Sequence, residues 1–142
     1  MRYVLDASVV TKWLLPEVDS PAALAILDGA LSGHLALMAP ALLGLEFGHV
    51  LGNERRRGRC DLETADRLWS AFRGLPVTLV SARLLQDRAF RLSLDLRITI
   101  YEAIYLAVAE ADGAPLITAD SGLITATGGS DHRVVLMDTV TL

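Results

Sequence analysis

Residues 3–10 read Tyr3-Val4-Leu5-Asp6-Ala7-Ser8-Val9-Val10, a short apolar run that leads directly into an acid. Short apolar or β-branched runs between turn signals are typical of buried strands. The sequence holds four more such runs, the first of them closed by a proline: residues 35–38, 77–80, 115–118 and 134–137. The run 115–118 also leads into an acid, Asp120. We therefore expect a sheet in which two strands end in a carboxylate.

Helical signals lie between the predicted strands. Asp19-Ser20-Pro21 offers an N-cap followed by a first-turn proline, and Gly58 marks the end of a helix that carries apolar residues from Leu42 onward. Further helices are predicted from Asp61, over residues 82–94, from Thr99 and, as a short one, from Ser121. Strands that alternate with helices are typical of a parallel sheet covered on both faces. We predict a single domain over residues 1–142, a three-layer α/β/α fold with a mainly parallel sheet of about five strands.

The composition is that of a globular domain. Apolar residues make up 52% of the 142 residues and charged residues 21%, which excludes a disordered chain. The 17 acids and 13 bases give a formal net charge of −4, which argues against binding nucleic acid through bulk positive charge. The single cysteine, Cys60, forms neither an internal disulfide nor a metal framework.

The apolar runs are too short for a secretion signal or a membrane span. Asp6 interrupts the first run, and Pro40 interrupts the longest one, residues 35–45. We expect a cytoplasmic protein with no membrane contact.

Two acids, Asp6 and Asp120, each follow a predicted strand. In open parallel sheets, functional residues collect beyond the carboxyl ends of the strands, near the point where the strand order reverses. If the first and fourth strands are neighbours, these two carboxylates face one crevice. Each acid also has a simpler explanation as the N-cap of the helix that follows, although Ser8 could cap in place of Asp6.

Two glutamates, Glu46 and Glu102, complete a set of four candidate carboxylates. Glu46 lies in a largely apolar stretch, where a charge is costly unless it binds a metal or pairs with a base such as Arg2 or Lys12. Glu102 lies three residues after Thr99, the spacing of a capping box that needs no chemistry. Taken together, four carboxylates at strand ends and helix starts favour a site for a hard cation, Mg²⁺ or Mn²⁺.

Four segments resemble the PIN-domain ribonucleases, and most closely the VapC-like toxins of bacterial and archaeal toxin–antitoxin pairs: residues 5–17, 40–46, 99–109 and 116–120. They follow the family's order over nearly the whole chain. The resemblance implies adjacent first and fourth strands, a hydroxyl at Ser8 beside the site, and an acidic metal site made of Asp6, Glu46, Glu102 and Asp120. The family usually has Asp where this chain has Glu102, whose carboxylate lies one bond further from the backbone.

The resemblance also implies a reaction and partners. The reaction would be hydrolysis of RNA phosphodiester bonds with Mg²⁺ or Mn²⁺. Asp6 and Asp120 would hold the principal ion, while Glu46 and Glu102 would complete the site or orient the attacking water. The implied partners are an antitoxin protein, whose tail would shield the acidic groove, and a second copy of the chain in a homodimer.

Positive charge that could guide RNA is concentrated after the helix that carries Glu46. The candidates are Arg55, Arg56, Arg57 and Arg59, together with Lys12 near the first motif. Arginine suits forked contacts with phosphate. Cations at the end of a helix also stabilise it without any ligand, and this alternative stays open.

Two other functions stay open as well. A catalytically silent binding module would keep the PIN fold without cleaving RNA. A receiver-like phospho-acceptor domain would also use acids at strand ends on an α/β sheet. Such a domain normally needs an adjacent pair of acids after the first strand and a late lysine, and the sequence has neither.

Overall fold

The computed structural model describes residues 1–15, 21–128, 130 and 132–140. Its five-stranded sheet has the order β3-β2-β1-β4-β5, and all neighbouring strands are parallel. The strands are β1 (Arg2–Leu5), β2 (Ala36–Pro40), β3 (Val77–Val80), β4 (Leu116–Thr118) and β5 (Val134–Leu136). The chain places β2 and β3 on one side of β1 and then returns to place β4 and β5 on the other. The strand order therefore reverses between β1 and β4, which confirms the predicted adjacency.

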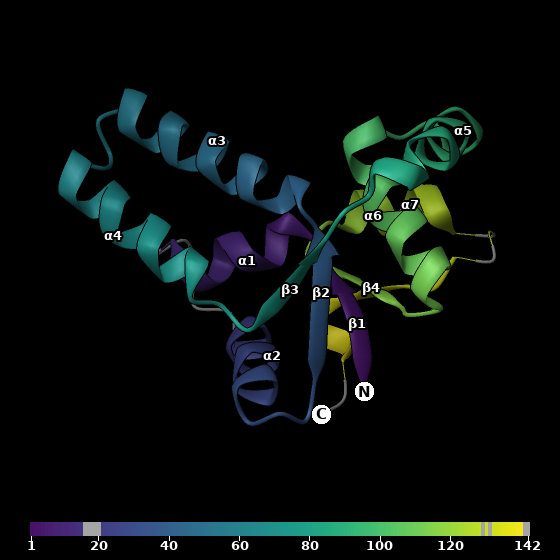
Figure 1. Ribbon diagram of the computed structural model, residues 1–142, viewed down its shortest axis with the longest axis horizontal. Helices are drawn as coiled ribbons and strands as arrows, with labels where there is room; N and C mark the ends of the chain where they lie inside the picture. Colours follow the sequence, from purple (N-terminus) through teal and green to yellow (C-terminus); the bar gives the residue numbers. More distant parts are fainter. Residues whose placement is uncertain (16–20, 129, 131, 141–142) are drawn as a thin grey trace.

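Helices cover both faces of the sheet, and the predicted three-layer α/β/α fold is confirmed. Helices α1 to α4 lie on one side of the sheet and α5 to α7 on the other (Figure 1). Their bounds are α1 (Ala7–Leu14), α2 (Pro21–Leu31), α3 (Leu42–Arg56), α4 (Leu62–Arg73), α5 (Gln86–Leu96), α6 (Ile100–Asp112) and α7 (Ser121–Thr127).

The core is centred on the two strands at the point of reversal. Val4 and Leu5 of β1 and Leu116 and Ile117 of β4 are all 0% exposed. Helix α6 packs on this part of the sheet and buries its whole middle, Ala103 to Ala109. Strands buried on both faces have continuous apolar sequences, which is why these short runs were recognisable as strands.

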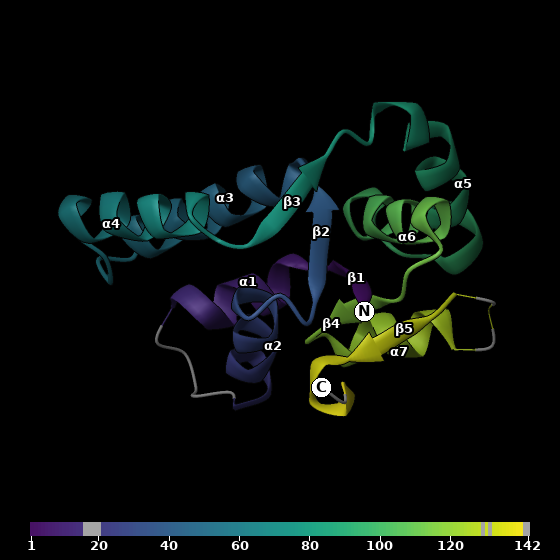
Figure 2. The ribbon, with the colours of Figure 1, turned by 60° about the horizontal axis from the view of Figure 1, so that its bottom comes forward.

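Helices α3 and α4 form a hairpin that extends away from the sheet (Figure 1, Figure 2). Phe72 of α4 stacks on Phe47 of α3 with ring centroids 5.0 Å apart, and on Trp69 at 5.3 Å. Gly58 follows α3 in the left-handed conformation (φ 71°), as predicted for the end of this helix. The base of the hairpin, where α3 begins, lies at the carboxyl end of β2.

Helices α2 and α5 begin at or close to the positions predicted from the sequence. The helix predicted over residues 82–94 begins at Gln86, because Arg83–Leu85 form a tighter 3-10 turn before it. Helix α2 begins at Pro21 as predicted, whereas Asp19 and Ser20 lie outside the described residues. No helix within the described ranges is long and apolar enough to cross a membrane.

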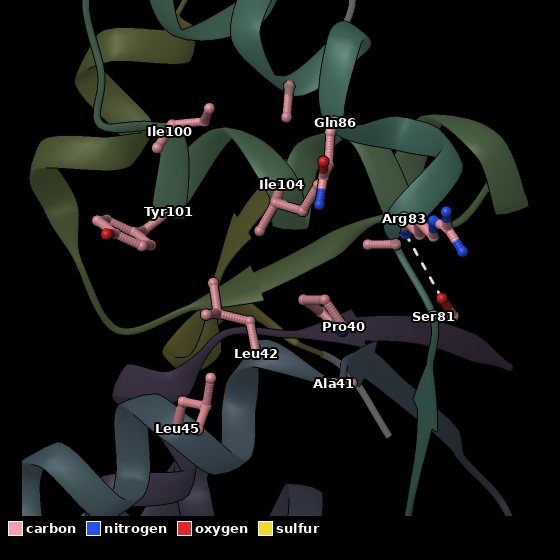
Figure 3. Close-up of a pocket in the computed structure, with 12 residues that line it drawn as sticks. Pro40, Ala41, Leu42, Leu45, Ser81, Arg83, Gln86, Ile100, Tyr101 and Ile104 are labelled. Carbon is pink, nitrogen blue, oxygen red and sulfur yellow. Dashed lines mark hydrogen bonds between the residues drawn. The ribbon is translucent and has the colours of Figure 1, made fainter.

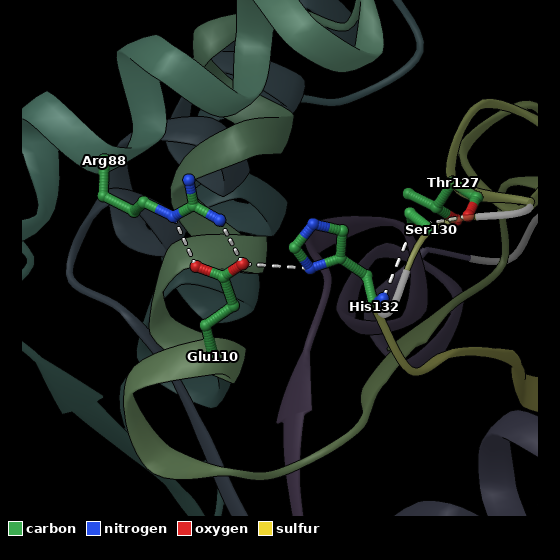
Figure 4. Close-up of polar contacts among 5 residues, drawn as sticks. All are labelled: Arg88, Glu110, Thr127, Ser130 and His132. Carbon is green, nitrogen blue, oxygen red and sulfur yellow. Dashed lines mark hydrogen bonds and ion pairs between the residues drawn. The ribbon is translucent and has the colours of Figure 1, made fainter.

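A polar network fixes the C-terminal part of α6 (Figure 4). Arg88 of α5 donates two hydrogen bonds to Glu110 of α6, from Nε to Oε2 at 2.7 Å and from Nη2 to Oε1 at 2.6 Å. His132, just before β5, places Nδ1 3.2 Å from Glu110 Oε1. Arg88 lowers the pKa of Glu110, so this carboxylate stays charged and paired. The network anchors the end of α6 that lies away from Glu102.

Candidate acidic site at the strand ends

Asp6, directly after β1, is held by two hydroxyl groups. Its Oδ2 accepts hydrogen bonds from Ser8 Oγ at 2.5 Å and from Thr118 Oγ1 at 2.8 Å. Asp6 occupies the N-cap position of α1, but its side chain makes no capping hydrogen bond. The carboxylate therefore has no capping role and is positioned by groups from both β4 and α1.

The same two hydroxyls connect the ends of β1 and β4. Ser8 Oγ accepts a hydrogen bond from the amide of Ala119, and Thr118 Oγ1 accepts one from the amide of Asp120, both at 3.0 Å. Each hydroxyl has a single proton, which it donates to Asp6, so the direction of both hydrogen bonds is set. Ser8 thus lies beside the acids as predicted. Thr118 was not predicted, although a single polar residue at the end of an apolar strand was a usable signal.

Glu46, in the second turn of α3, is partly buried and accepts a hydrogen bond from the Tyr105 hydroxyl of α6. Burial raises the pKa of Glu46, and the charges of Asp6 and Glu102 raise it further, while the hydrogen bond from Tyr105 opposes the shift. Burial and the Glu46 carboxylate raise the pKa of Tyr105 well above its usual value. Tyr105 therefore stays protonated and acts as a fixed donor to Glu46.

The alternative of an ion pair for Glu46 is not realised. Among the described residues no base pairs with Glu46, and Arg2 instead binds Asp112, with Nη1 and Oδ1 3.1 Å apart. Tyr105 takes the place of the expected base. This role was not predicted, because an aromatic residue on the apolar face of a helix is usually a core residue. Tyr105 and Glu46 are also 59 residues apart in the chain, so no local pattern links them.

The capping box predicted at the start of α6 is confirmed. Thr99 Oγ1 accepts a hydrogen bond from the amide of Glu102 at 3.1 Å. In return, Glu102 Oε2 accepts hydrogen bonds from the amide of Thr99 at 2.8 Å and from its hydroxyl at 2.7 Å. Glu102 nevertheless lies near Glu46, since both line one cavity of about 780 Å³, which we call the acidic cavity; Ser8 lines it too, whereas Asp6 and Asp120 do not.

The N-cap predicted for Asp120 is confirmed too. Its Oδ1 accepts a hydrogen bond from the amide of Gly122 at 2.7 Å, in the first turn of α7. The amide of Asp120 binds the Thr118 hydroxyl, and that hydroxyl binds Asp6. The Asp6 carboxylate and the backbone amide of Asp120 are therefore joined through one hydroxyl group at the point where the strand order reverses.

All four carboxylates share one feature. In each, one oxygen is bound by the protein, and the other receives no hydrogen bond from the described residues. The bound atoms are Asp6 Oδ2, Glu46 Oε2, Glu102 Oε2 and Asp120 Oδ1. A carboxylate held by one oxygen has a restricted orientation and still presents an acceptor on the other. A structural role and a ligand-binding role are therefore compatible at each position.

The chemistry of these donors fits a hard divalent cation. Carboxylate oxygens are the ligands that Mg²⁺ and Mn²⁺ prefer. The charges of Asp6 and Glu102 already raise the pKa of Glu46, and a bound cation would offset this repulsion. Within the described part of the chain, no three His, Cys, Asp or Glu side chains are close enough to hold a metal as they stand. A cation held directly by three or more of these acids would require their free oxygens to move towards one another, whereas Mg²⁺ commonly binds one or two carboxylates and keeps several waters.

The arginines predicted to bind RNA lie at the end of α3 that is furthest from the sheet (Figure 1). Lys12, in the last turn of α1, directly follows Thr11, which lines the acidic cavity. Arg59 donates from Nε to Glu54 Oε2 at 2.7 Å, and Arg56 donates to Asn53. Arg55 and Arg56 occupy the last turn of α3, where cations stabilise the helix end. Their contact with RNA stays a prediction.

A sequence model of the PIN domain matches residues 3–128. The chain therefore belongs to the PIN-domain family, and the resemblance seen in its motifs is confirmed. Ribonuclease VapC3 of Pyrobaculum aerophilum is 34% identical over 127 residues, which cover 87% of this chain and 92% of that protein. Ribonuclease VapC1 of Mycobacterium tuberculosis is 32% identical over 127 residues, which cover 88% of this chain and 90% of that protein.

Solved structures share the fold. PAE2754 from Pyrobaculum aerophilum has a TM-score of 0.72 at 27% identity, covering 97% of this chain and 90% of that one. VapBC2 from Rickettsia felis, solved with a DNA fragment from its promoter, has a TM-score of 0.71 and covers 96% of this chain and 98% of that one. Its 11% identity makes it evidence for the fold alone.

Glu46→Gln is expected to stabilise the metal-free protein at neutral pH. The pKa of Glu46 in the native state lies above its ordinary value of 4.5, so the native state binds this proton more tightly than the unfolded chain does. Ionisation at higher pH therefore costs the wild type stability that the neutral amide keeps. The advantage in free energy of unfolding, measured with denaturant in EDTA, should shrink as the pH falls through the native pKa towards 4.5.

Glu54→Gln, on the same helix, is the control, and its effect on the free energy of unfolding should have the opposite sign. The hydrogen bond from Arg59 lowers the pKa of Glu54, so this carboxylate contributes stability above its ordinary pKa that is lost as the pH falls through the native value. The amide variant should be the less stable protein at pH 7 and approach the wild type in acid. A Glu46→Gln effect that does not vary with pH would contradict the charge-burial explanation.

Proposed function

We propose that this chain is a metal-dependent endoribonuclease that acts as the toxin of a toxin–antitoxin pair. The observation that carries the proposal is the pairing of β1 with β4, through which the Thr118 hydroxyl joins the Asp6 carboxylate to the backbone amide of Asp120. Each acid keeps one oxygen that no described residue binds. Relatives named Ribonuclease VapC, 32% and 34% identical over most of the chain, support ribonuclease activity.

The four acids are proposed to hold Mg²⁺ or Mn²⁺. Asp6 and Asp120 are the principal ligands, and Glu46 and Glu102 complete the site or orient the attacking water. When bound, such an ion polarises a phosphoryl oxygen, lowers the pKa of its water and offsets charge on the leaving oxygen. With their charges otherwise uncompensated, the acids repel the phosphates of RNA.

The protein's own groups keep the acids oriented for this role. Ser8 and Thr118 hold one oxygen of Asp6, so the carboxylate cannot rotate freely. Tyr105 does the same for Glu46 from the opposite face of the sheet. Donors that are already in place before substrate arrives need little reorganisation during the reaction. Replacing any of these three hydroxyl donors is therefore expected to weaken catalysis without removing an acid.

The proposed partners are RNA as substrate, an antitoxin protein and a second copy of the chain. The relatives named VapC, and structural neighbours described as toxin–antitoxin complexes, support an antitoxin partner. A cytoplasmic location and a homodimer follow from the same proposal. Membership of the PIN family removes the receiver-like domain as a competing function. A catalytically silent binding module remains the competitor, and it differs from the proposal only in the absence of cleavage.

Asp6→Asn should lower RNA cleavage by about 100-fold or more, the range seen when one preorganised charged or polar group is removed. The amide can still accept the hydrogen bonds from Ser8 and Thr118, so we expect the fold to survive. The assay is cleavage of labelled single-stranded RNA with Mg²⁺ or Mn²⁺, with EDTA as the metal-free blank and circular dichroism as the test of folding.

Asp112→Asn is the matched control, since Asp112 pairs with Arg2 where β1 begins, far from the acidic strand ends. An exposed ion pair of this kind contributes little to stability, so this variant should cleave RNA normally. Suppose that the wild type cuts no RNA with either ion, and that its expression is as harmless to cells as that of Asp6→Asn. The proposed ribonuclease function is then contradicted, and the catalytically silent binding module is the function that the results support.

Glu102→Gln distinguishes the capping role of Glu102 from its proposed role as a metal ligand. Glutamine also forms a capping box, so the free energy of unfolding should change by less than about 0.5 kcal/mol. The affinity for Mn²⁺, followed by electron paramagnetic resonance of the free ion, should fall about 10-fold or more because a charged ligand is lost. Unchanged Mn²⁺ affinity would leave Glu102 with the capping role alone.

A further inference from the structure

Figure 3 shows a second cavity, of about 540 Å³. It is bounded by the start of α3, the segment after β3, and helices α5 and α6. Leu42, Leu45 and Tyr101 line both this cavity and the acidic one, so the two spaces adjoin along a shared wall. Tyr101 directly precedes Glu102 in the chain, so the two residues lie next to each other in the first turn of α6.

The shared wall is apolar and exposed. Leu45 is 74% exposed and Tyr101 60%, and Ile100, which lines only the second cavity, is 43% exposed. These side chains are not part of the buried core, and Tyr101 lines a cavity that Glu46 and Glu102 also line. Exposed apolar surface bordered by polar groups usually marks a binding groove. The volume also lies in the range of about 300–1,000 Å³ found for pockets that bind small organic groups.

The other side of the cavity carries hydrogen-bonding groups without negative charge. The amide of Gln86, at the start of α5, points into the space above Pro40, and Arg83 and Ser81 lie at its edge (Figure 3). Among the described residues no carboxylate lines this cavity. A primary amide offers both donors and an acceptor, as the edge of a nucleobase does. The cavity thus combines a flat aromatic ring, apolar walls and a group able to read a polar edge.

We propose that this cavity binds an unpaired nucleobase of the RNA substrate, next to the phosphate that a cation on the acids would contact. This inference rests on the proposed ribonuclease function. Tyr101 would stack on the base, Leu42 and Leu45 would cover its edge, and Gln86 would contact its hydrogen-bonding groups. Proteins that recognise single-stranded RNA typically stack splayed bases on aromatic side chains and read their edges with polar groups.

The continuity of the two cavities favours RNA over a protein segment as the occupant. A base and its phosphate belong to one nucleotide, so a site for one beside a site for the other is the arrangement that RNA needs. Arg83 adds positive charge at the edge of the groove, where the neighbouring phosphate of the same strand would pass. An apolar protein segment would use the leucines but would leave the Gln86 amide without a matched partner.

The test measures kcat/KM for a short single-stranded RNA of mixed sequence and for versions that carry one abasic nucleotide at successive positions. In the wild type, an abasic nucleotide at one position beside the cut should lower kcat/KM about 5- to 100-fold, the range for loss of one stacked base. Tyr101→Leu should show a similar loss on intact RNA and no further loss at that position. Gln86→Leu should change which base is preferred there.

Two controls separate stacking from general damage. Tyr101→Phe keeps the ring and should retain the sensitivity to the abasic position that Tyr101→Leu loses. Phe90→Leu removes another exposed aromatic ring, 51% exposed on α5 and outside both cavities, and should behave as the wild type. The subsite is contradicted if Tyr101→Leu stays as sensitive to the abasic position as the wild type, or if no abasic position matters.

The remaining outcomes distinguish this inference from the proposed function. If the wild type cuts no RNA with Mg²⁺ or Mn²⁺, the proposed function fails and the base subsite fails with it. If the wild type cuts RNA but Tyr101→Leu cuts intact RNA equally well, only the subsite fails. In that case, loss of binding to a protein partner by Tyr101→Leu would assign the groove to protein contact instead.

Discussion

The parallel pairing of β1 with β4 is the constraint on which the rest of the site depends. It brings residues more than 100 positions apart in the chain into one hydrogen-bonded cluster, in which Thr118 donates to Asp6 and accepts from the amide of Asp120. Val4 and Leu5 of β1 and Leu116 and Ile117 of β4 are fully buried, so a change of register would disrupt the close packing of the core. The backbone of the site is therefore held in place by the core beneath it.

A buried carboxylate with no base beside it lowers the stability of the folded protein. Glu46 is partly buried near two other carboxylates, and its pKa is raised as a result. Tyr105 and the Thr99 cap offset part of this cost by holding one oxygen of Glu46 and of Glu102. Proteins usually carry such local destabilisation where they bind charge, and a cation is the ligand that would relieve it. Glu102 and Asp120 each use one oxygen to cap a helix, and this leaves the other oxygen available to the site.

Much of this could be predicted from sequence. The five apolar runs became the five strands, and the Thr99 capping box and the left-handed Gly58 lie where local patterns placed them. The resemblance to the PIN family supplied the adjacency of β1 and β4. The Tyr105–Glu46 pair, the Thr118 bridge and the groove beside Tyr101 could not be predicted. Each depends on how helices pack across the sheet, and that packing leaves no local signal.

The most direct test of the central claim is a crystal structure grown with Mn²⁺, in which the anomalous signal of manganese locates the ion. We predict a peak within coordination distance of Asp6 and Asp120 at the ends of β1 and β4, with the free oxygens of these acids turned towards it. Saturating Mn²⁺ with no peak at these residues, or with peaks only at other surface acids, would contradict the claim that the strand ends form a cation site.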